Sequence, residues 1–186
     1  MKLLRKAFFL AVGYLTLLSG CATSGSTIGP VPMAPFRLSN AYIQWIDNPS
    51  MPFKVQQVTY GGAPPALTES AREISRGYMR SISSVFNQYA VDDMQSALSV
   101  KGITPGQAQT ITLTQVDGVY GGAEVFAVIR VNIFDNATRQ SWNGFVKVTS
   151  GVLVSGPNNN PPTREFSKSL TSGAISAFQQ AGLMKN

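Results

Sequence analysis

The 186-residue sequence contains no histidine and a single cysteine. The absence of histidine removes the usual general base, the Ser-His and Cys-His nucleophile pairs and the commonest zinc ligand. A Ser-Lys pair needs no histidine, but Ser-x-x-Lys does not occur in the chain. No calcium-loop pattern and no phosphate-binding glycine-rich loop occurs either. We therefore expect no catalytic residue, no metal site and no cofactor.

Charged residues are also scarce, at 13% of the chain. The nine acidic residues are scattered, and the adjacent Asp92 and Asp93 do not face each other on a helix. An enzyme that uses two carboxylates stays open, but it is the weakest of the function classes. The basic residues form no dense tract, so we expect no nucleic-acid partner.

The N-terminal residues 1–20 have the layout of a secretory signal. Lys2, Arg5 and Lys6 precede an apolar run over residues 7–18, and small residues follow it. The run is shorter than the roughly twenty residues that a membrane-spanning helix needs. Without these twenty residues the chain keeps twelve basic and nine acidic residues, a net charge of +3 instead of the +6 of the whole sequence.

The tetrapeptide Leu18-Ser19-Gly20-Cys21 resembles the lipobox of bacterial lipoproteins. This resemblance implies that Cys21 is lipidated and becomes the new N-terminus. A lone cysteine agrees with that role, because an exported chain with one thiol cannot form an internal disulfide. The alternative is a signal cleaved elsewhere that leaves Cys21 idle. Ala22 stands where lipoproteins retained at the inner membrane typically carry Asp, which favours the periplasmic face of the outer membrane.

Three regions follow from this interpretation. Residues 1–20 are the signal peptide, and residues 21–35, rich in small residues and proline, form the lipidated N-terminus and a flexible tether. Residues 36–186 are enough for a single globular domain.

Strand signals recur along this domain as β-branched and aromatic runs that end at turn residues. We expect strands over residues 36–46, 53–60, 109–116, 123–134 and 141–154. In the fourth of these, Ala127, Ile129 and Val131 share one face, and Arg130 and Asn132 share the other. Both faces also carry further apolar residues, so we expect a central strand that helices cover on one side. Asp117-Gly118, Gly121-Gly122 and Asp135-Asn136 are the expected turns.

Two segments show helical periodicity. The capping-box spacing Ser70 to Glu73 opens the first, which ends at Lys101-Gly102, and Thr163 opens the second, which ends near Gly182. The predicted fold class is α+β. It consists of a mainly antiparallel sheet of about five strands with two helices packed on one face, in the order ββ-α-βββ-α.

Arg72, Arg76 and Arg80 are four residues apart and predict a basic stripe on the first helix. One hypothesis is a patch that binds acidic lipid head groups, cell-wall carboxylates or a partner protein. The alternative, which we favour, is a solvated face with ordinary ion pairs. Trp45 and Trp142 are interface anchors on one interpretation and core residues on the other, and we favour the core.

The combination of lipobox, strands and two helices is similar to a loose group of small Gram-negative envelope lipoproteins. They include assembly factors, activators of cell-wall synthases and auxiliary proteins of lipid-transport ABC systems. The resemblance implies a lipid-anchored, non-enzymatic accessory or scaffold protein that binds an envelope protein partner. The alternative is a module that binds an envelope ligand, peptidoglycan or lipid, directly. The sequence leaves the partner and the oligomeric state open.

Overall fold

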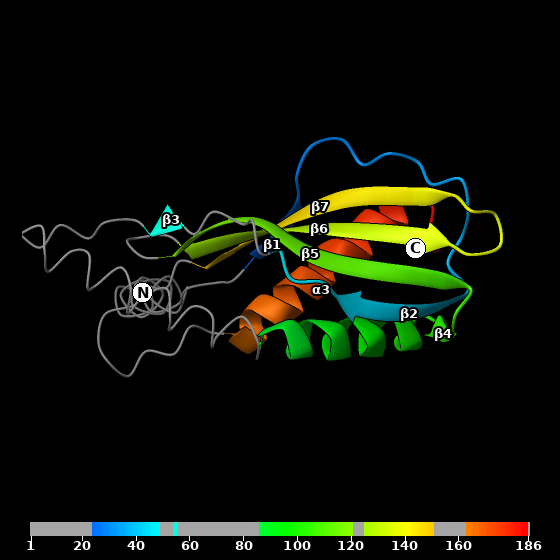
Figure 1. The fold of residues 1–186 in the computed structure, drawn as a ribbon, viewed down its shortest axis with the longest axis horizontal. Coiled ribbons are helices and arrows are strands. Elements are labelled where there is room, and N and C mark those ends of the chain that lie inside the picture. The colour runs from blue at the N-terminus through cyan, green and yellow to red at the C-terminus, as the bar shows by residue number, and fades with distance from the viewer. Residues whose placement is uncertain (1–23, 49–53, 56–85, 121–124, 151–162, 186) are drawn as a thin grey trace, which may run out of the picture.

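The structure is a computed structural model that describes residues 24–48, 54–55, 86–120, 125–150 and 163–185. Within these residues, seven strands form one sheet with two helical segments beside it (Figure 1). The strands are β1 (Ser24–Thr27), β2 (Asn40–Trp45), β3 (Lys54–Val55), β4 (Thr104–Pro105), β5 (Gln109–Tyr120), β6 (Val125–Asp135) and β7 (Ser141–Ser150). The helices are the segment 86–100, green and unlabelled in Figure 1, and α3 (Thr163–Gln180).

The sheet has the strand order β1-β7-β6-β5-β2-β4, and β3 pairs with the far part of β5. The strands β1, β7, β6 and β5 are antiparallel to their neighbours in that series. The strands β2 and β3 run parallel to β5, and β4 runs parallel to β2. The sheet is therefore mixed, and β6 lies near its middle.

Both helical segments lie on the same side of the sheet (Figure 1). Their buried residues recur every three or four positions and join one core with the inward side chains of the strands. From the helices this core takes Phe86, Ala90, Met94, Leu98, Phe166, Leu170, Ala174, Ala177 and Phe178. The segment 86–100 ends as the sequence predicts, because Gly102 has φ +82° and the Ile103 amide donates to the Leu98 carbonyl. No helix in the described ranges has the length and apolar character that spanning a membrane requires.

The alternation expected in β6 is confirmed. Ala127, Ile129, Val131 and Ile133 are buried against the helices, whereas Arg130 on the opposite face is exposed. Trp142 is buried, and Trp45 is half-buried with its ring 5.4 Å from that of Phe86. Both tryptophans therefore pack against the core.

The α+β class with two helices on one face is confirmed, but the predicted sheet and element order are wrong. In the described residues the order is βββ-α-ββββ-α instead of ββ-α-βββ-α. In the described residues the sheet has seven strands, not about five, and it is mixed instead of mainly antiparallel. The physical reason is the connection from β2 to β5, which passes through the segment 86–100. A strand-helix-strand unit brings the chain back in its original direction, so β2 and β5 pair in parallel. The strand expected over 109–116 also continues to Tyr120 through a bulge, so Asp117-Gly118 is not a turn.

The tether expected over residues 21–35 is also corrected, because residues 24–35 pack on the folded body. β1 pairs with β7, and the amide of Ile28 donates to the Phe145 carbonyl at 3.0 Å. The Trp142 indole then donates to the Pro32 carbonyl at 2.8 Å, and the Ala34 amide donates to the Ala181 carbonyl at 2.9 Å. We call residues 24–35 the N-terminal arm. Cys21 to Thr23 lie outside the described residues.

Candidate functional site

The four residues singled out from the sequence as sites all lie outside the described residues. They are the expected lipidation site Cys21 and the arginines of the expected stripe, Arg72, Arg76 and Arg80. A functional surface must therefore be sought among the residues that the structure places.

The carboxylates that the structure describes are those of Asp47, Asp92, Asp93, Asp117, Asp135 and Glu165. In the part of the chain that the structure describes, no three Cys, Asp or Glu side chains are grouped as metal ligands. Asp135 is the most tightly held of them. Its Oδ2 accepts a hydrogen bond from Gln109 Nε2 at 2.7 Å, and its Oδ1 accepts bonds from the amide and hydroxyl of Thr138 at 2.7 and 2.9 Å. These bonds, that of Gln109 first, lower the pKa of Asp135 below its ordinary value, and burial opposes them. Such a carboxylate stays ionised and serves the structure.

The sheet surface that points away from the helices is the largest candidate site. No described element covers it, and we call it the open face. Successive residues of a strand point to opposite sides, so every second residue of each strand contributes to it. Its side chains are those of Tyr42, Gln44, Ile46, Thr110, Thr112, Thr114, Phe126, Val128, Arg130, Asn132, Phe134, Asn143, Phe145 and Lys147.

A row of polar side chains crosses the middle of the open face. The strand register places Gln44, Thr112, Asn132 and Asn143 opposite one another in that order. Gln44 Nε2 donates to Thr112 Oγ1 at 3.2 Å, and Asn132 Nδ2 donates to Asn143 Oδ1 at 2.8 Å. These bonds fix the amides but leave further donors and acceptors for a ligand or partner, because each amide group has four hydrogen-bonding positions.

Part of this row lines a shallow hollow of about 700 Å³. The lining residues are Ile46, Asp47, Asn48, Thr112, Thr114, Val116, Arg130, Asn132 and Asn143. At one edge, Asp47 Oδ1 accepts hydrogen bonds from the Trp45 indole and from Asn87 Nδ2, both at 3.0 Å. Among the described residues, Arg130 is exposed and forms no hydrogen bond or ion pair. The hollow therefore offers one cation, Arg130, and one carboxylate, Asp47, among neutral donors and acceptors.

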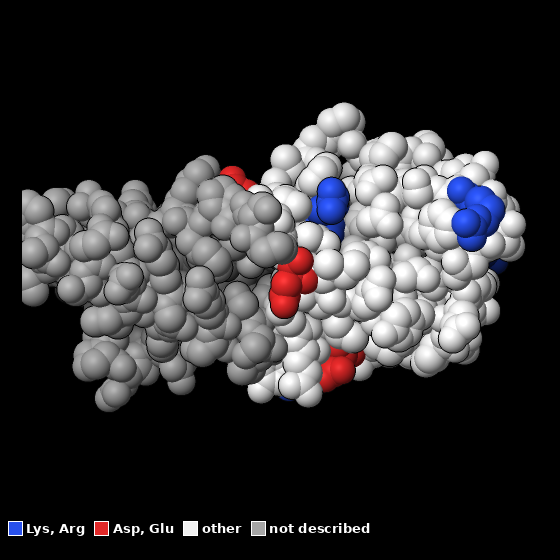
Figure 2. All heavy atoms as spheres, viewed as in Figure 1, with Lys and Arg blue, Asp and Glu red and all other residues white. Residues whose placement is uncertain are grey.

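Large apolar side chains border the polar row. Tyr42, Ile46 and Phe145 are 55%, 48% and 40% exposed. In the view of Figure 1 the strands lie in front of α3, and Figure 2 shows from the same side a described surface with few charged groups. Exposed aromatic side chains beside an arginine and neutral polar groups are typical of surfaces that bind other proteins.

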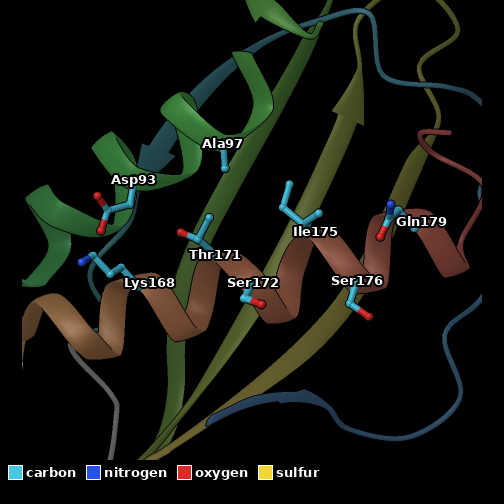
Figure 3. A pocket seen from close by; sticks show the side chains of 8 residues that line it. All are labelled: Asp93, Ala97, Lys168, Thr171, Ser172, Ile175, Ser176 and Gln179. Atoms are coloured by element: carbon cyan, nitrogen blue, oxygen red, sulfur yellow. The ribbon is translucent and has the colours of Figure 1, made fainter. Parts of the chain in front are cut away.

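A second hollow, of about 450 Å³, lies between the two helices (Figure 3). Asp93 and Ala97 line it from the segment 86–100, and α3 contributes the six other side chains, which include Thr171 and Ile175. Asp93 is already engaged, because its Oδ2 accepts from Ser167 Oγ at 2.6 Å and its Oδ1 lies 3.4 Å from Arg164 Nη2. The buried Oγ1 of Thr171 has no hydrogen-bond partner among the described residues. This groove can exchange hydrogen bonds with a group that enters it.

No protein-family model matches the sequence, and no curated protein sequence is significantly similar to it. Two solved structures of PelC from Paraburkholderia phytofirmans, both described as dodecamers, are weakly similar to this structure. One, of a variant protein, shares 10% identity at a TM-score of 0.39 and covers 88% of this chain and 99% of its own. The other shares 9% identity at a TM-score of 0.40 and covers 85% and 96%. Similarity at this level does not extend to side chains, so the site rests on the residues of this chain alone.

The open face was not predicted from the sequence as a site. One sequence feature did point to it, because the alternation in β6 predicted Arg130 and Asn132 on the same side. It could not place Thr112 and Asn143 beside them, because the register between strands depends on backbone pairing that no single segment encodes.

Proposed function

We propose that this chain is a lipid-anchored accessory protein of the bacterial envelope and that it binds another protein through the open face. It works without catalysis, at the periplasmic side of the outer membrane. The lipobox resemblance of Leu18-Ser19-Gly20-Cys21 supports the anchor. A diacylated cysteine holds a protein at a bilayer far more firmly than a single acyl chain does, because each buried methylene adds about 0.8 kcal/mol.

The observation that carries the binding proposal is the exposure of Tyr42, Ile46 and Phe145 around a hydrogen-bonded polar row. A monomeric antiparallel sheet commonly has one face in solvent, but the side chains on that face are normally polar. Aromatic and aliphatic side chains on it lose water favourably when a partner covers them, and roughly 25 cal/mol is gained per Å² of apolar surface. The amides and Arg130 would then set the orientation of the partner.

The test is affinity capture from detergent-solubilised envelopes with the acylated protein as bait. The variant Tyr42→Ser/Phe145→Ser removes both exposed aromatic groups from the open face. We expect it to lose most of the captured partner, while the control Val100→Ser keeps it. Val100 is a fair control because it is 86% exposed at the end of the helical segment 86–100 and does not belong to the open face. Equal capture by all three proteins contradicts the proposal.

A second function is favoured by the hollow itself. Its exposed Arg130 and its amide side chains suit a ligand with hydroxyl or acidic groups, such as peptidoglycan or a lipid head group. Binding of the purified protein to isolated cell wall or to lipid vesicles, lost in Arg130→Gln without any protein partner, supports this function over the first.

A further inference from the structure

The first described strand begins very close to the expected anchor. β1 starts at Ser24, three residues after Cys21, and Ser24 pairs with Thr149 of β7. Three residues of fully extended chain reach at most about 11 Å. The polar layer of a bilayer leaflet is itself about 5–7 Å thick. If the acyl chains of Cys21 lie in the hydrocarbon, Ser24 is held within several ångströms of the membrane surface.

Ser24 also marks one end of the described part of the sheet. Through the register, Thr149 lies opposite Phe126, Phe126 lies opposite Val119, and Val119 lies opposite Lys54 of β3. We call this end, made of Ser24, Lys54, Val119, Phe126 and Thr149, the proximal end. The turn 136–140 between β6 and β7 is the distal end, at the other side of Figure 1. The 11 residues of β6 that separate the ends span about 36 Å at about 3.3 Å per residue.

β1 is packed closely on the body and cannot rotate independently of it. A Cβ atom on Gly25 would lie 1.9 Å from the carbonyl oxygen of Ser169 in α3, so the backbone of β1 touches the backbone of the helix. A Cβ on Gly173 would lie 2.7 Å from Val146 Cγ1 of β7, so this glycine lets helix and strand approach closely. The arm continues with the bond from the Ile28 amide to the Phe145 carbonyl. Because β1 is packed rigidly on the body, the position of the anchor also determines the position of the whole sheet relative to the membrane.

Two surfaces could contact the membrane, the N-terminal arm and the proximal end, and they differ in charge. The N-terminal arm, residues 24–35, contains no Lys or Arg. Beside the proximal end, Lys147 has its Nζ 4.5 Å from the centre of the Phe126 ring. Asp117 lies across the sheet from Lys147, because both residues pair with Val128. Its Oδ1 accepts a hydrogen bond from the amide of Gly118. A lysine stem beside an aromatic ring suits the interface of a membrane with acidic phospholipids.

We infer that the proximal end of the sheet rests on the phospholipid surface and that the strands rise away from it. This orientation rests on the proposed lipid anchoring of Cys21. The open face is then roughly perpendicular to the membrane surface. A partner protein anchored in the same leaflet can reach it there. The body does not stand off from the bilayer on a long tether.

Fluorophores on single introduced cysteines test this orientation in the full mature protein. The labels are placed at Thr149→Cys on the proximal end, at Ala137→Cys on the distal turn, and at Met33→Cys. Met33 is 74% exposed and follows Pro32, whose carbonyl is bonded to Trp142 near the distal end. Acylated Cys21 leaves each introduced thiol as the sole labelling position. The proteins are reconstituted in vesicles of phosphatidylethanolamine and phosphatidylglycerol that contain a head-group quencher.

We expect several-fold stronger quenching at Thr149→Cys than at the two other positions. Equal quenching at Ala137→Cys overturns the orientation, and equal quenching at Met33→Cys shows instead that the body lies flat on its arm. A Gly-Ser linker inserted between Thr23 and Ser24 should weaken quenching at Thr149→Cys, and an unchanged signal also contradicts the inference. Mass spectrometry of the N-terminal peptide separates the two proposals. An unacylated Cys21 overturns the anchor itself, whereas an acylated Cys21 with uniform quenching overturns only the orientation.

Discussion

Asp135 shows how one residue joins three parts of the chain. Its carboxylate accepts hydrogen bonds from Gln109 at the start of β5 and from Thr138 in the turn after β6. Gln109 Oε1 accepts in turn from the amide of Ser39, just before β2. This network fixes the distal end of the sheet, so the register of β5 against β6 depends on it.

The substitution Asp135→Asn should lower the melting temperature at neutral pH. The hydrogen bonds lower the pKa of Asp135 in the folded protein below the unfolded value near 3.8. The carboxylate therefore stabilises the fold above about pH 4, and this contribution is lost as the pH falls through the lowered folded pKa. Thermal unfolding at pH 7 and at pH 3 checks this. Asp92→Asn, at an exposed position of the helical segment 86–100, is the control. A difference between wild type and Asp135→Asn that persists undiminished at pH 3 contradicts the account.

Two phenylalanines separate stability from binding. Phe178 is fully buried in α3 with its ring 5.7 Å from that of Trp142, whereas Phe145 is 40% exposed on the open face. Phe178→Ala should cost about 3–5 kcal/mol of unfolding free energy, because it leaves a cavity in the core. Phe145→Ala should cost at most about 0.5 kcal/mol, as surface substitutions usually do. Denaturant titrations of both variants measure the two costs, and similar costs would show that the open face is covered in the folded protein.

At the scale of elements, the N-terminal arm is the main departure from expectation. Ser24–Thr27 lacks the β-branched alternation that predicts a strand, and the residues after it are rich in proline and small side chains. This composition favours a tether in isolation. The small residues have another use in the fold, because Gly25 allows the arm to touch the backbone of α3. A property of two surfaces in contact cannot be inferred from one segment.

Gly25→Val should detach β1 from the body. Its side chain would meet the carbonyl oxygen of Ser169, which belongs to helix backbone and cannot turn aside. We expect faster amide hydrogen exchange in the β7 residues that pair with β1, from Val146 to Thr149. Ser26→Ala, on an exposed position of the same strand, serves as the control. Unchanged protection of β7 in Gly25→Val would mean that β1 does not depend on this contact.

The other elements show what a single sequence can supply. The stripe of α3 and the alternation of β6 predicted which side chains are buried, because each pattern follows from the geometry of one element. The direction of β2 relative to β5 and the short strand β4 were not predicted, because they depend on how separate elements pair. The polar row on the open face was not predicted for the same reason, because it takes one residue from each of four strands.

At the scale of the whole molecule, the two layers have different proposed tasks. The helices and the inward side chains form the core, and the outward side chains of the same strands form the open face. The proposed anchor would bring this surface to the membrane, and the proximal contact would turn it toward neighbours in the same leaflet. Stability and recognition are thereby assigned to opposite sides of one sheet.

The most direct test of the central claim is photo-crosslinking in living cells. A photoreactive amino acid is placed at Tyr42 or Phe145 on the open face, and at Ser172 or Ser176 on the exposed side of α3. The account predicts covalent adducts with another envelope protein from the two open-face positions and none from the two helix positions. Adducts from the helix positions alone, or none from either strand position, would contradict it.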